Sequence, residues 1–151
     1  IFDAAKDELF YAEKGAGAWM NGPRMNDERI RVSARSRVSD SLYATGIPFA
    51  ASVVDLPSTS QQLKRLMPIS AGVRRLGSAA LDLAYVAAGR YDGYWESGLK
   101  SWDIAAGVVI AREAGAIVEA LDKGGDEPHD LGNVICANDA QFEEFAKIIR
   151  N

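Results

Sequence analysis

Hydrophobic and polar residues follow one another differently in the first forty residues and in the remainder of the chain. In the first forty, short alternating runs are separated by turns that contain glycine. Residues 9–13 and 16–20 flank Lys14-Gly15, which is typical of a tight turn between two antiparallel strands. Residues 29–33 also alternate and predict a short edge strand. This part of the chain is therefore predicted to form an antiparallel arrangement.

After residue 40, continuous apolar runs alternate with helical patterns. Strands are predicted at residues 42–47, 73–76, 91–96, 116–121 and 133–137. Helices are predicted at residues 58–67, 78–88 and 102–114, and in a last segment capped by Asn138 that has Phe142, Phe145, Ile148 and Ile149 on one face. Residues 122–131 are predicted to form a polar turn. This alternation predicts a layered α/β sheet covered by helices.

The helix predicted at residues 102–114 differs from the others in composition. From Ile104 to Ala111 it is apolar or small on every face, which predicts a helix buried on most sides. Ser101 is the predicted N-cap and Gly115 the predicted left-handed stop. Asp103 lies alone in the first turn, where the helix dipole favours a carboxylate. Such an Asp often caps its own helix, so a structural interpretation stands beside any functional one.

Composition narrows the class of protein. A chain of 151 residues with 48% hydrophobic content can bury a sizeable core. The net charge of −4 and the lack of a basic cluster argue against a nucleic-acid binder. One cysteine and one histidine argue against a disulfide framework and a Cys/His zinc site. With no long apolar span and no secretory signal, we expect no membrane association and a cytoplasmic protein.

Special residues occur at three predicted strand-to-helix junctions or strand ends. Gly77-Ser78-Ala79 opens one helix, Glu96 ends a strand, and Asp103 opens the next helix. Ligand sites in open α/β sheets lie at the carboxyl ends of strands, so these groups are expected to gather there. Each also has a structural interpretation, as a helix cap or as a solvated acid. His129 is expected in a solvated loop and Cys136 in the core.

The order of motifs resembles that of a known family. Trp102-Asp103-x-Ala105-Ala106-Gly107, followed by Glu113-Ala114-Gly115, resembles the second signature of the inositol monophosphatase family, which comprises magnesium-dependent, lithium-sensitive phosphomonoesterases. Further matches in order and spacing lie at residues 7–15, 17–21, 75–80 and 94–98. The resemblance implies the layered αβαβα sugar-phosphatase fold, α/β in its second domain and α+β overall. Residues 1–40 would be the terminal strands of an incomplete first domain, and residues 41–151 the second α/β domain.

The resemblance also implies a site. Asp103 would bind a catalytic Mg²⁺ and contact the substrate beside its phosphate. Gly77, Ser78 and Ala79 would line the pocket for the alcohol part of the substrate, and Glu96 would accept a hydrogen bond from one of its hydroxyls. Oxygen ligands of this kind suit Mg²⁺. The implied substrate is a sugar or polyol phosphate such as inositol 1-phosphate, and a homodimer is expected.

Two parts of the family pattern are missing from the sequence. The first signature, Asp-Pro-x-Asp-Gly-Thr, and an upstream Glu-Glu pair supply further metal ligands, and both would lie before Ile1. The chain therefore resembles the carboxyl-terminal half of such an enzyme. One alternative is a non-catalytic binding or dimerisation module. Within the family, fructose 1,6-bisphosphate, histidinol phosphate and nucleotide 3′-phosphates are alternative substrates.

Overall fold

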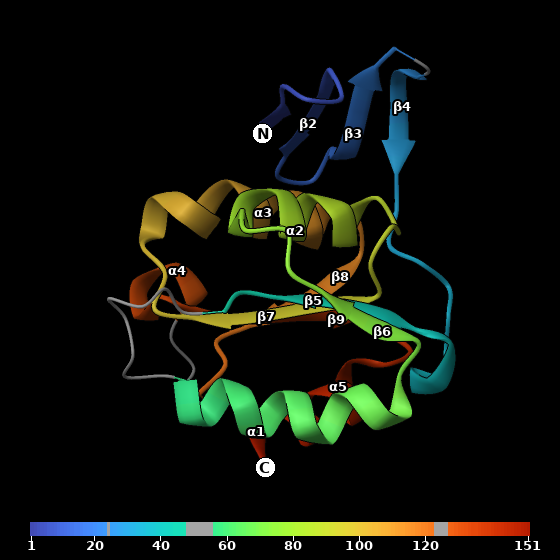
Figure 1. Cartoon of the computed structure of the whole chain (residues 1–151). Helices are drawn as coiled ribbons and strands as arrows, with labels where there is room; N and C mark the ends of the chain where they lie inside the picture. The colour runs from blue at the N-terminus through green and yellow to red at the C-terminus, as the bar shows by residue number, and fades with distance from the viewer. Residues whose placement is uncertain (24, 48–55, 123–126) are drawn as a thin grey trace.

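The chain folds into stacked layers of sheets and helices (Figure 1). The computed structural model describes residues 1–23, 25–47, 56–122 and 127–151. From top to bottom, Figure 1 shows a small sheet, helices α2 and α3, a second sheet, and helices α1 and α5. Among the described residues, no helix is both long and apolar enough to cross a bilayer. The layered α/β fold predicted from the sequence is confirmed.

The first sheet is antiparallel throughout and follows the chain order β1-β2-β3-β4. Its strands are β1 (Phe2–Asp3), β2 (Glu8–Glu13), β3 (Gly17–Gly22) and β4 (Met25–Ile30). The predicted turn joins β2 to β3, and Gly15 adopts a φ of 83° that favours glycine there. The predicted edge strand at residues 29–33 is misplaced, because the chain leaves the sheet after Ile30. The Val32 amide donates instead to the Ala114 carbonyl at 3.1 Å.

The second sheet is mixed, with the order β6-β5-β7-β9-β8. Its strands are β5 (Leu42–Thr45), β6 (Gly72–Arg74), β7 (Gly93–Ser97), β8 (Ala116–Glu119) and β9 (Asn133–Asn138). Strand β5 pairs in parallel with β6 and β7, while β9 runs antiparallel to β7 and β8. The carboxyl ends of β5, β6 and β7 therefore meet at one edge, as expected for a ligand site.

The helices are α1 (Leu56–Leu66), α2 (Ala79–Ala87), α3 (Ser101–Glu113), α4 (Pro128–Leu131) and α5 (Phe142–Arg150). The sequence located all of them except α4, which replaces part of the predicted polar turn. Four residues are too few to show a helical period, so α4 was not detectable. His129 therefore lies in a short helix, not in a loop. The last helix begins later than predicted, and Asn138 accepts from the Gln141 amide just before it at 3.1 Å.

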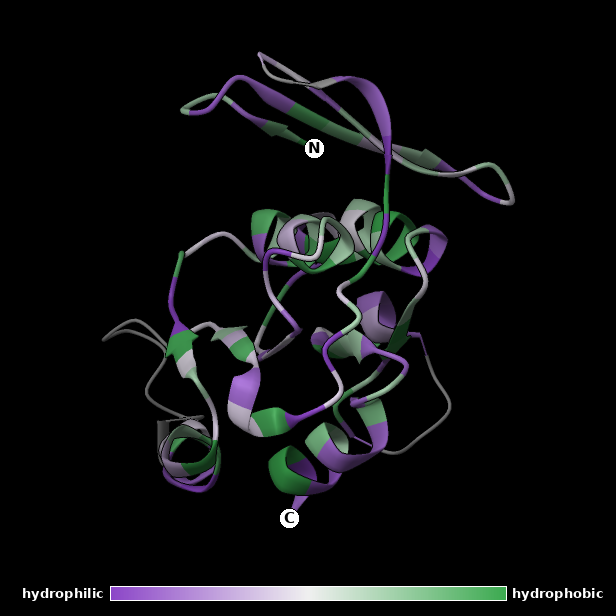
Figure 2. Ribbon diagram, turned by 90° about the vertical axis from the view of Figure 1, so that its right-hand side faces the viewer, coloured by the Kyte–Doolittle hydropathy of each residue, from purple (hydrophilic) through white to green (hydrophobic). Residues whose placement is uncertain are grey.

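Two apolar clusters cover opposite faces of the second sheet. The first lies between the sheets and joins Phe10 of β2, Leu83 of α2, Val108 of α3 and Cys136 of β9. Cys136 is fully buried, as predicted, and burial raises the pKa of its thiol. In Figure 2, α2 and α3 form the layer between the sheets, and the segment after β4 descends past them.

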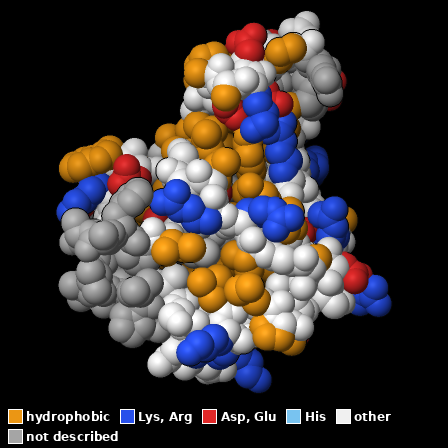
Figure 3. Space-filling model, in the orientation of Figure 1, with side chains coloured by type: hydrophobic (Ala, Val, Ile, Leu, Met, Phe, Trp, Pro, Cys, Tyr) orange, Lys and Arg blue, Asp and Glu red, His pale blue; other side chains and the backbone are white. Residues whose placement is uncertain are grey.

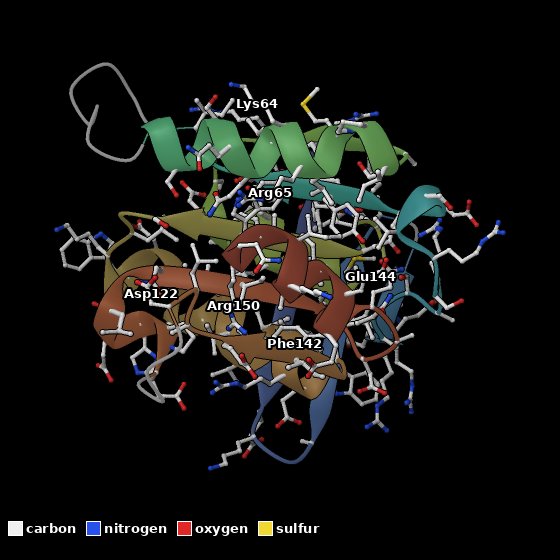
Figure 4. The ribbon with its side chains drawn as sticks, turned by 90° about the horizontal axis from the view of Figure 1, so that it is seen from below. Lys64, Arg65, Asp122, Phe142, Glu144 and Arg150 are labelled. Carbon is white, nitrogen blue, oxygen red and sulfur yellow. The ribbon has the colours of Figure 1, made fainter. Side chains whose placement is uncertain are left out.

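The second cluster lies between the second sheet and the helices α1 and α5. These two helices run side by side on the lower face of the sheet (Figure 4). Arg65 of α1 points toward α5, where its Nε donates to the Ile148 carbonyl at 2.8 Å. Its Nη2 donates to the Ile149 carbonyl at 3.0 Å. These bonds satisfy carbonyls at the end of α5 that have no partner within the helix.

Helix α3 departs from its prediction in two respects. Lys100, and not Ser101, is the N-cap, and the Lys100 amide donates to Asp103 Oδ2 at 2.8 Å. Gly115 ends the helix with a φ of 94°, as predicted. Burial on most sides was wrong, because the face of α3 that carries Ala105 and Val109 is exposed. Hydrophobic side chains are visible at the surface in the region of α2 and α3 below the first sheet (Figure 3).

The far end of α3 is tied to the first sheet. The Glu113 carboxylate accepts the amides of Gly15 and Gly17 at 2.8 and 2.9 Å. These two hydrogen bonds lower the pKa of Glu113 below its usual value. The Glu of the Glu-Ala-Gly motif therefore joins α3 to the β2–β3 turn.

Candidate functional site

A cavity of about 430 Å³ opens where the parallel strands of the second sheet end. Gly46 follows β5, Arg75 follows β6, and Glu96 lies near the end of β7. All five residues proposed from the sequence line this one cavity, namely Gly77, Ser78, Ala79, Glu96 and Asp103. Its wall also includes Thr45, Gly46, Thr59, Gln62, Arg75, Trp95 and Trp102. The sheet topology therefore gathers the groups in the way the sequence predicted.

The Gly77-Ser78-Ala79 turn brings the amino end of α2 to the cavity. Gly77 has a φ of 91°, and Ser78 is the N-cap that was predicted. The Ser78 hydroxyl accepts from the Leu81 amide at 3.4 Å, which is a long hydrogen bond. Ser78 thus caps α2, as predicted, and also forms part of the cavity wall.

Glu96 is not a solvated strand-end acid, because it is half-buried in the cavity wall. The Tyr94 hydroxyl donates to Glu96 Oε2. Burial, together with the charge of Asp103, raises the pKa of Glu96, although the Tyr94 hydrogen bond and the Arg75 charge act against this rise. A carboxylate held in this way is suited to accept a hydrogen bond from a ligand hydroxyl.

Asp103 has a structural role and a place in the cavity wall. It caps α3 through Oδ2, and it lies in the cavity wall, half-buried. A carboxylate has two oxygens with several acceptor positions, so capping does not prevent it from binding a metal ion. Asp103 therefore suits one position in the coordination shell of a hard cation.

The described residues do not make a complete magnesium site. Mg²⁺ needs near-octahedral oxygen coordination, which usually combines one or two carboxylates with water and substrate phosphate. Within the described ranges, no group of three or more His, Cys, Asp or Glu residues could hold a metal ion. Asp103 fits as a single ligand, in agreement with the absence of the first signature. No catalytic step through a metal follows from this chain alone.

Gln62 was not identified from the sequence. It comes from α1, it is only 7% exposed, and its Oε1 accepts from Trp95 Nε1 at 2.8 Å. An indole nitrogen can only donate, so this bond fixes the amide with its oxygen toward Trp95 and its nitrogen turned away. No local motif announces this contact, because the two residues are 33 positions apart.

Asp82 is an acid in the first turn of α2. It is 1% exposed, and neither carboxylate oxygen has a hydrogen-bond partner among the described residues. Burial, and then the charge of Glu96, raises the pKa of Asp82 to about 7. Asp82 does not line the cavity, so its influence on the site is electrostatic.

Comparison with known proteins agrees with this geometry. The sequence profile of the inositol monophosphatase family matches residues 1–151. An inositol-1-monophosphatase of Rhizobium meliloti is 43% identical over 150 residues, which cover 99% of this chain and 52% of that protein. A Nus factor SuhB of Pseudomonas aeruginosa is 39% identical over 151 residues, which cover 99% of this chain and 54% of that protein.

A solved structure shows the same fold. The crystal structure of the extragenic suppressor protein suhB from Bartonella henselae superposes with a TM-score of 0.90 at 41% identity, covering 99% of this chain and 55% of that one. This chain spans about half the length of the curated relatives it matches. Both the full-length profile match and the level of identity lead to one conclusion: the chain belongs to the inositol monophosphatase family.

Proposed function

We propose that this chain is the alcohol-binding half of a magnesium-dependent phosphatase that hydrolyses a phosphate monoester of a polyol or sugar. The observation that carries the proposal is the shared cavity of Ser78, Glu96 and Asp103 at the carboxyl ends of the parallel strands. A relative named inositol-1-monophosphatase supports the class of substrate. Inositol 1-phosphate is therefore the first substrate to test.

Each residue has a proposed role. Asp103 holds one coordination position of Mg²⁺ and is oriented by its bond to the Lys100 amide. When bound, the metal would activate a water molecule and stabilise the leaving alkoxide. Glu96 accepts a hydrogen bond from a substrate hydroxyl, while the turn at Gly77 to Ala79 forms the adjacent wall. A substrate without that hydroxyl leaves the half-buried Glu96 carboxylate without this hydrogen bond, which selects for polyols.

The wider arrangement is part of the same proposal. Residues 1–40 belong to a first domain and residues 41–151 to the second α/β domain. The complete protein would be a lithium-sensitive cytoplasmic homodimer that does not bind nucleic acid. A non-catalytic binding or dimerisation module is the second candidate, and it is favoured by the lack of a three-ligand metal cluster among the described residues.

The test measures Mg²⁺-dependent phosphate release from inositol 1-phosphate by the complete protein, with and without lithium. We expect activity in the parent protein and its loss in Asp103→Asn. Glu143→Gln, on the exposed face of α5, is the matched control and keeps full activity. Unchanged turnover in Asp103→Asn would overturn the site, whereas a complete protein without Mg²⁺-dependent activity would favour the non-catalytic module.

A further inference from the structure

Gly46 lies against Glu96 at closer range than any side chain would allow. A Cβ added to Gly46 would lie 1.8 Å from Glu96 Oε1, 1.9 Å from its Cδ and 2.3 Å from its Oε2. The carboxylate thus fills the space of the missing side chain. The φ of Gly46 is not positive, so its backbone conformation does not itself require glycine. The close approach of Glu96 is what excludes a side chain.

The backbone around this contact is held in register. Strands β5 and β7 pair in parallel, with Ala44 opposite Tyr94 and Thr45 opposite Trp95. The Thr45 hydroxyl donates to the Trp95 carbonyl at 2.7 Å, which fixes the last pair before Gly46. Continuing this register brings Gly46 beside Glu96. The Tyr94 hydroxyl, on the same strand as Glu96, then holds the carboxylate in that position.

We propose that Gly46 is a specificity-determining residue: by lacking a side chain it sets where the Glu96 carboxylate lies, and so which substrate hydroxyl the cavity recognises. This inference rests on the proposed function of the cavity. Gly46 acts as a positioning residue, because its effect passes through Glu96.

An added methyl group would act on recognition more than on folding. Ordinary contacts to a Cβ begin at 3.4 Å, so the Glu96 carboxylate would have to move by roughly 1.5 Å. It is the end of a flexible side chain, so it can move while the backbone stays in place. Hydrogen bonds weaken steeply outside a narrow range of distance and angle, so such a movement breaks the bond to the substrate hydroxyl.

The experiment compares Gly46→Ala with the parent complete enzyme on two substrates. Inositol 1-phosphate has ring hydroxyls, whereas 4-nitrophenyl phosphate has none for Glu96 to bind. We expect the KM for inositol 1-phosphate to rise about tenfold, because one hydrogen bond to a charged group is lost. We expect kcat, and both constants for 4-nitrophenyl phosphate, to stay within about twofold. Ser39→Ala, at an exposed position outside the cavity wall, is the control and should change neither constant.

A double variant shows whether Gly46 acts through Glu96. Glu96→Ala removes the atoms that overlap the new methyl group, so adding Gly46→Ala to it should not raise the KM further. If Gly46→Ala alone lowers the melting temperature, Glu96→Ala should restore it for the same reason. Independent, additive effects of the two changes would overturn the inference.

Two further results have distinct meanings. A KM for inositol 1-phosphate that rises in Glu96→Ala but not in Gly46→Ala would overturn the role of Gly46 and leave the proposed function intact. Equal losses on both substrates in Gly46→Ala would also overturn it, since the damage would not concern hydroxyl recognition. A parent enzyme without activity on either substrate would overturn the proposed function itself, and the inference with it.

Discussion

The two ends of α3 carry acids of the same sequence signature, yet the structure uses them differently. Asp103 caps the amino end and lies in the wall of the cavity. Glu113, near the carboxyl end, accepts two backbone amides from the β2–β3 turn. One acid has acceptor positions that a ligand can reach, whereas both oxygens of the other are occupied by the protein. The signature therefore combines an acid that lines the cavity with an acid that joins two layers of the fold.

The largest expected effect is at the amino end of α3. In the complete protein, Asp103→Asn should lower kcat/KM at least about a hundredfold, since it removes the charged ligand that we propose for Mg²⁺. The Asn oxygen can still accept from the Lys100 amide, so the melting temperature should stay close to that of the parent. Steady-state kinetics and thermal unfolding measure the two effects. A large fall in melting temperature with little loss of activity would show instead that Asp103, like Glu113, acts mainly on the stability of the fold.

Asp82 is a third acid, which does not line the cavity as Asp103 does and lacks the backbone partners that Glu113 has. Its substitution is expected to have the next largest effect, on the free energy of unfolding. The folded-state pKa of about 7 lies above 3.8, the ordinary value for an Asp carboxyl group. Protonation of Asp82 therefore favours folding, and that contribution is lost as the pH rises from about 4 to about 7. Asp82→Asn does not ionise, so it should be more stable than the parent by up to about 4 kcal/mol at pH 8 and similar to it near pH 4.

Urea unfolding at both pH values tests this prediction. Asp122→Asn, at an exposed site, serves as the control and should show no comparable change. A difference between Asp82→Asn and the parent that is the same at pH 4 and pH 8 would contradict the assigned titration.

Glu113→Gln should affect stability and leave the chemistry intact. The amide has one carbonyl oxygen, so it can replace only part of the contact with the Gly15 and Gly17 amides. We expect a melting temperature a few degrees lower at pH 7 and a KM close to the parent value. Since these bonds lower the pKa of Glu113, its contribution is present above the ordinary carboxyl pKa and is lost as the pH falls from there through the lowered folded-state pKa. A difference in melting temperature that does not shrink as the pH is lowered below the ordinary carboxyl pKa would contradict this account.

Ser78→Ala should have the smallest effect. The cap bond to the Leu81 amide is long, at 3.4 Å, so its loss should cost about 0.5 kcal/mol, the lower limit for an N-cap. If the backbone alone forms this part of the cavity wall, KM should change less than about twofold. A tenfold rise in KM without loss of stability would show instead that the hydroxyl contacts the substrate.

The residues that were found in advance are those with local signals. The β2–β3 turn follows from Lys14-Gly15, the end of α3 from Gly115, and the start of α2 from Ser78. The cavity was predicted because the carboxyl ends of parallel strands meet at one edge. The interpretation of α3 as buried on most sides failed, because small apolar residues such as Ala105 fit an exposed face as well as a buried one.

The sequence by itself determined most of the elements, their order, and the family to which the chain belongs, since turns, caps and hydrophobic periods act between near neighbours. Only the tertiary structure decided that Glu96 occupies the space beside Gly46, that Gln62 bonds to Trp95, and that Asp82 is buried without a partner. Each of these depends on segments that are distant in the chain and are brought together by packing. The energies of close contact and of burial arise only there, so no local pattern could have shown them.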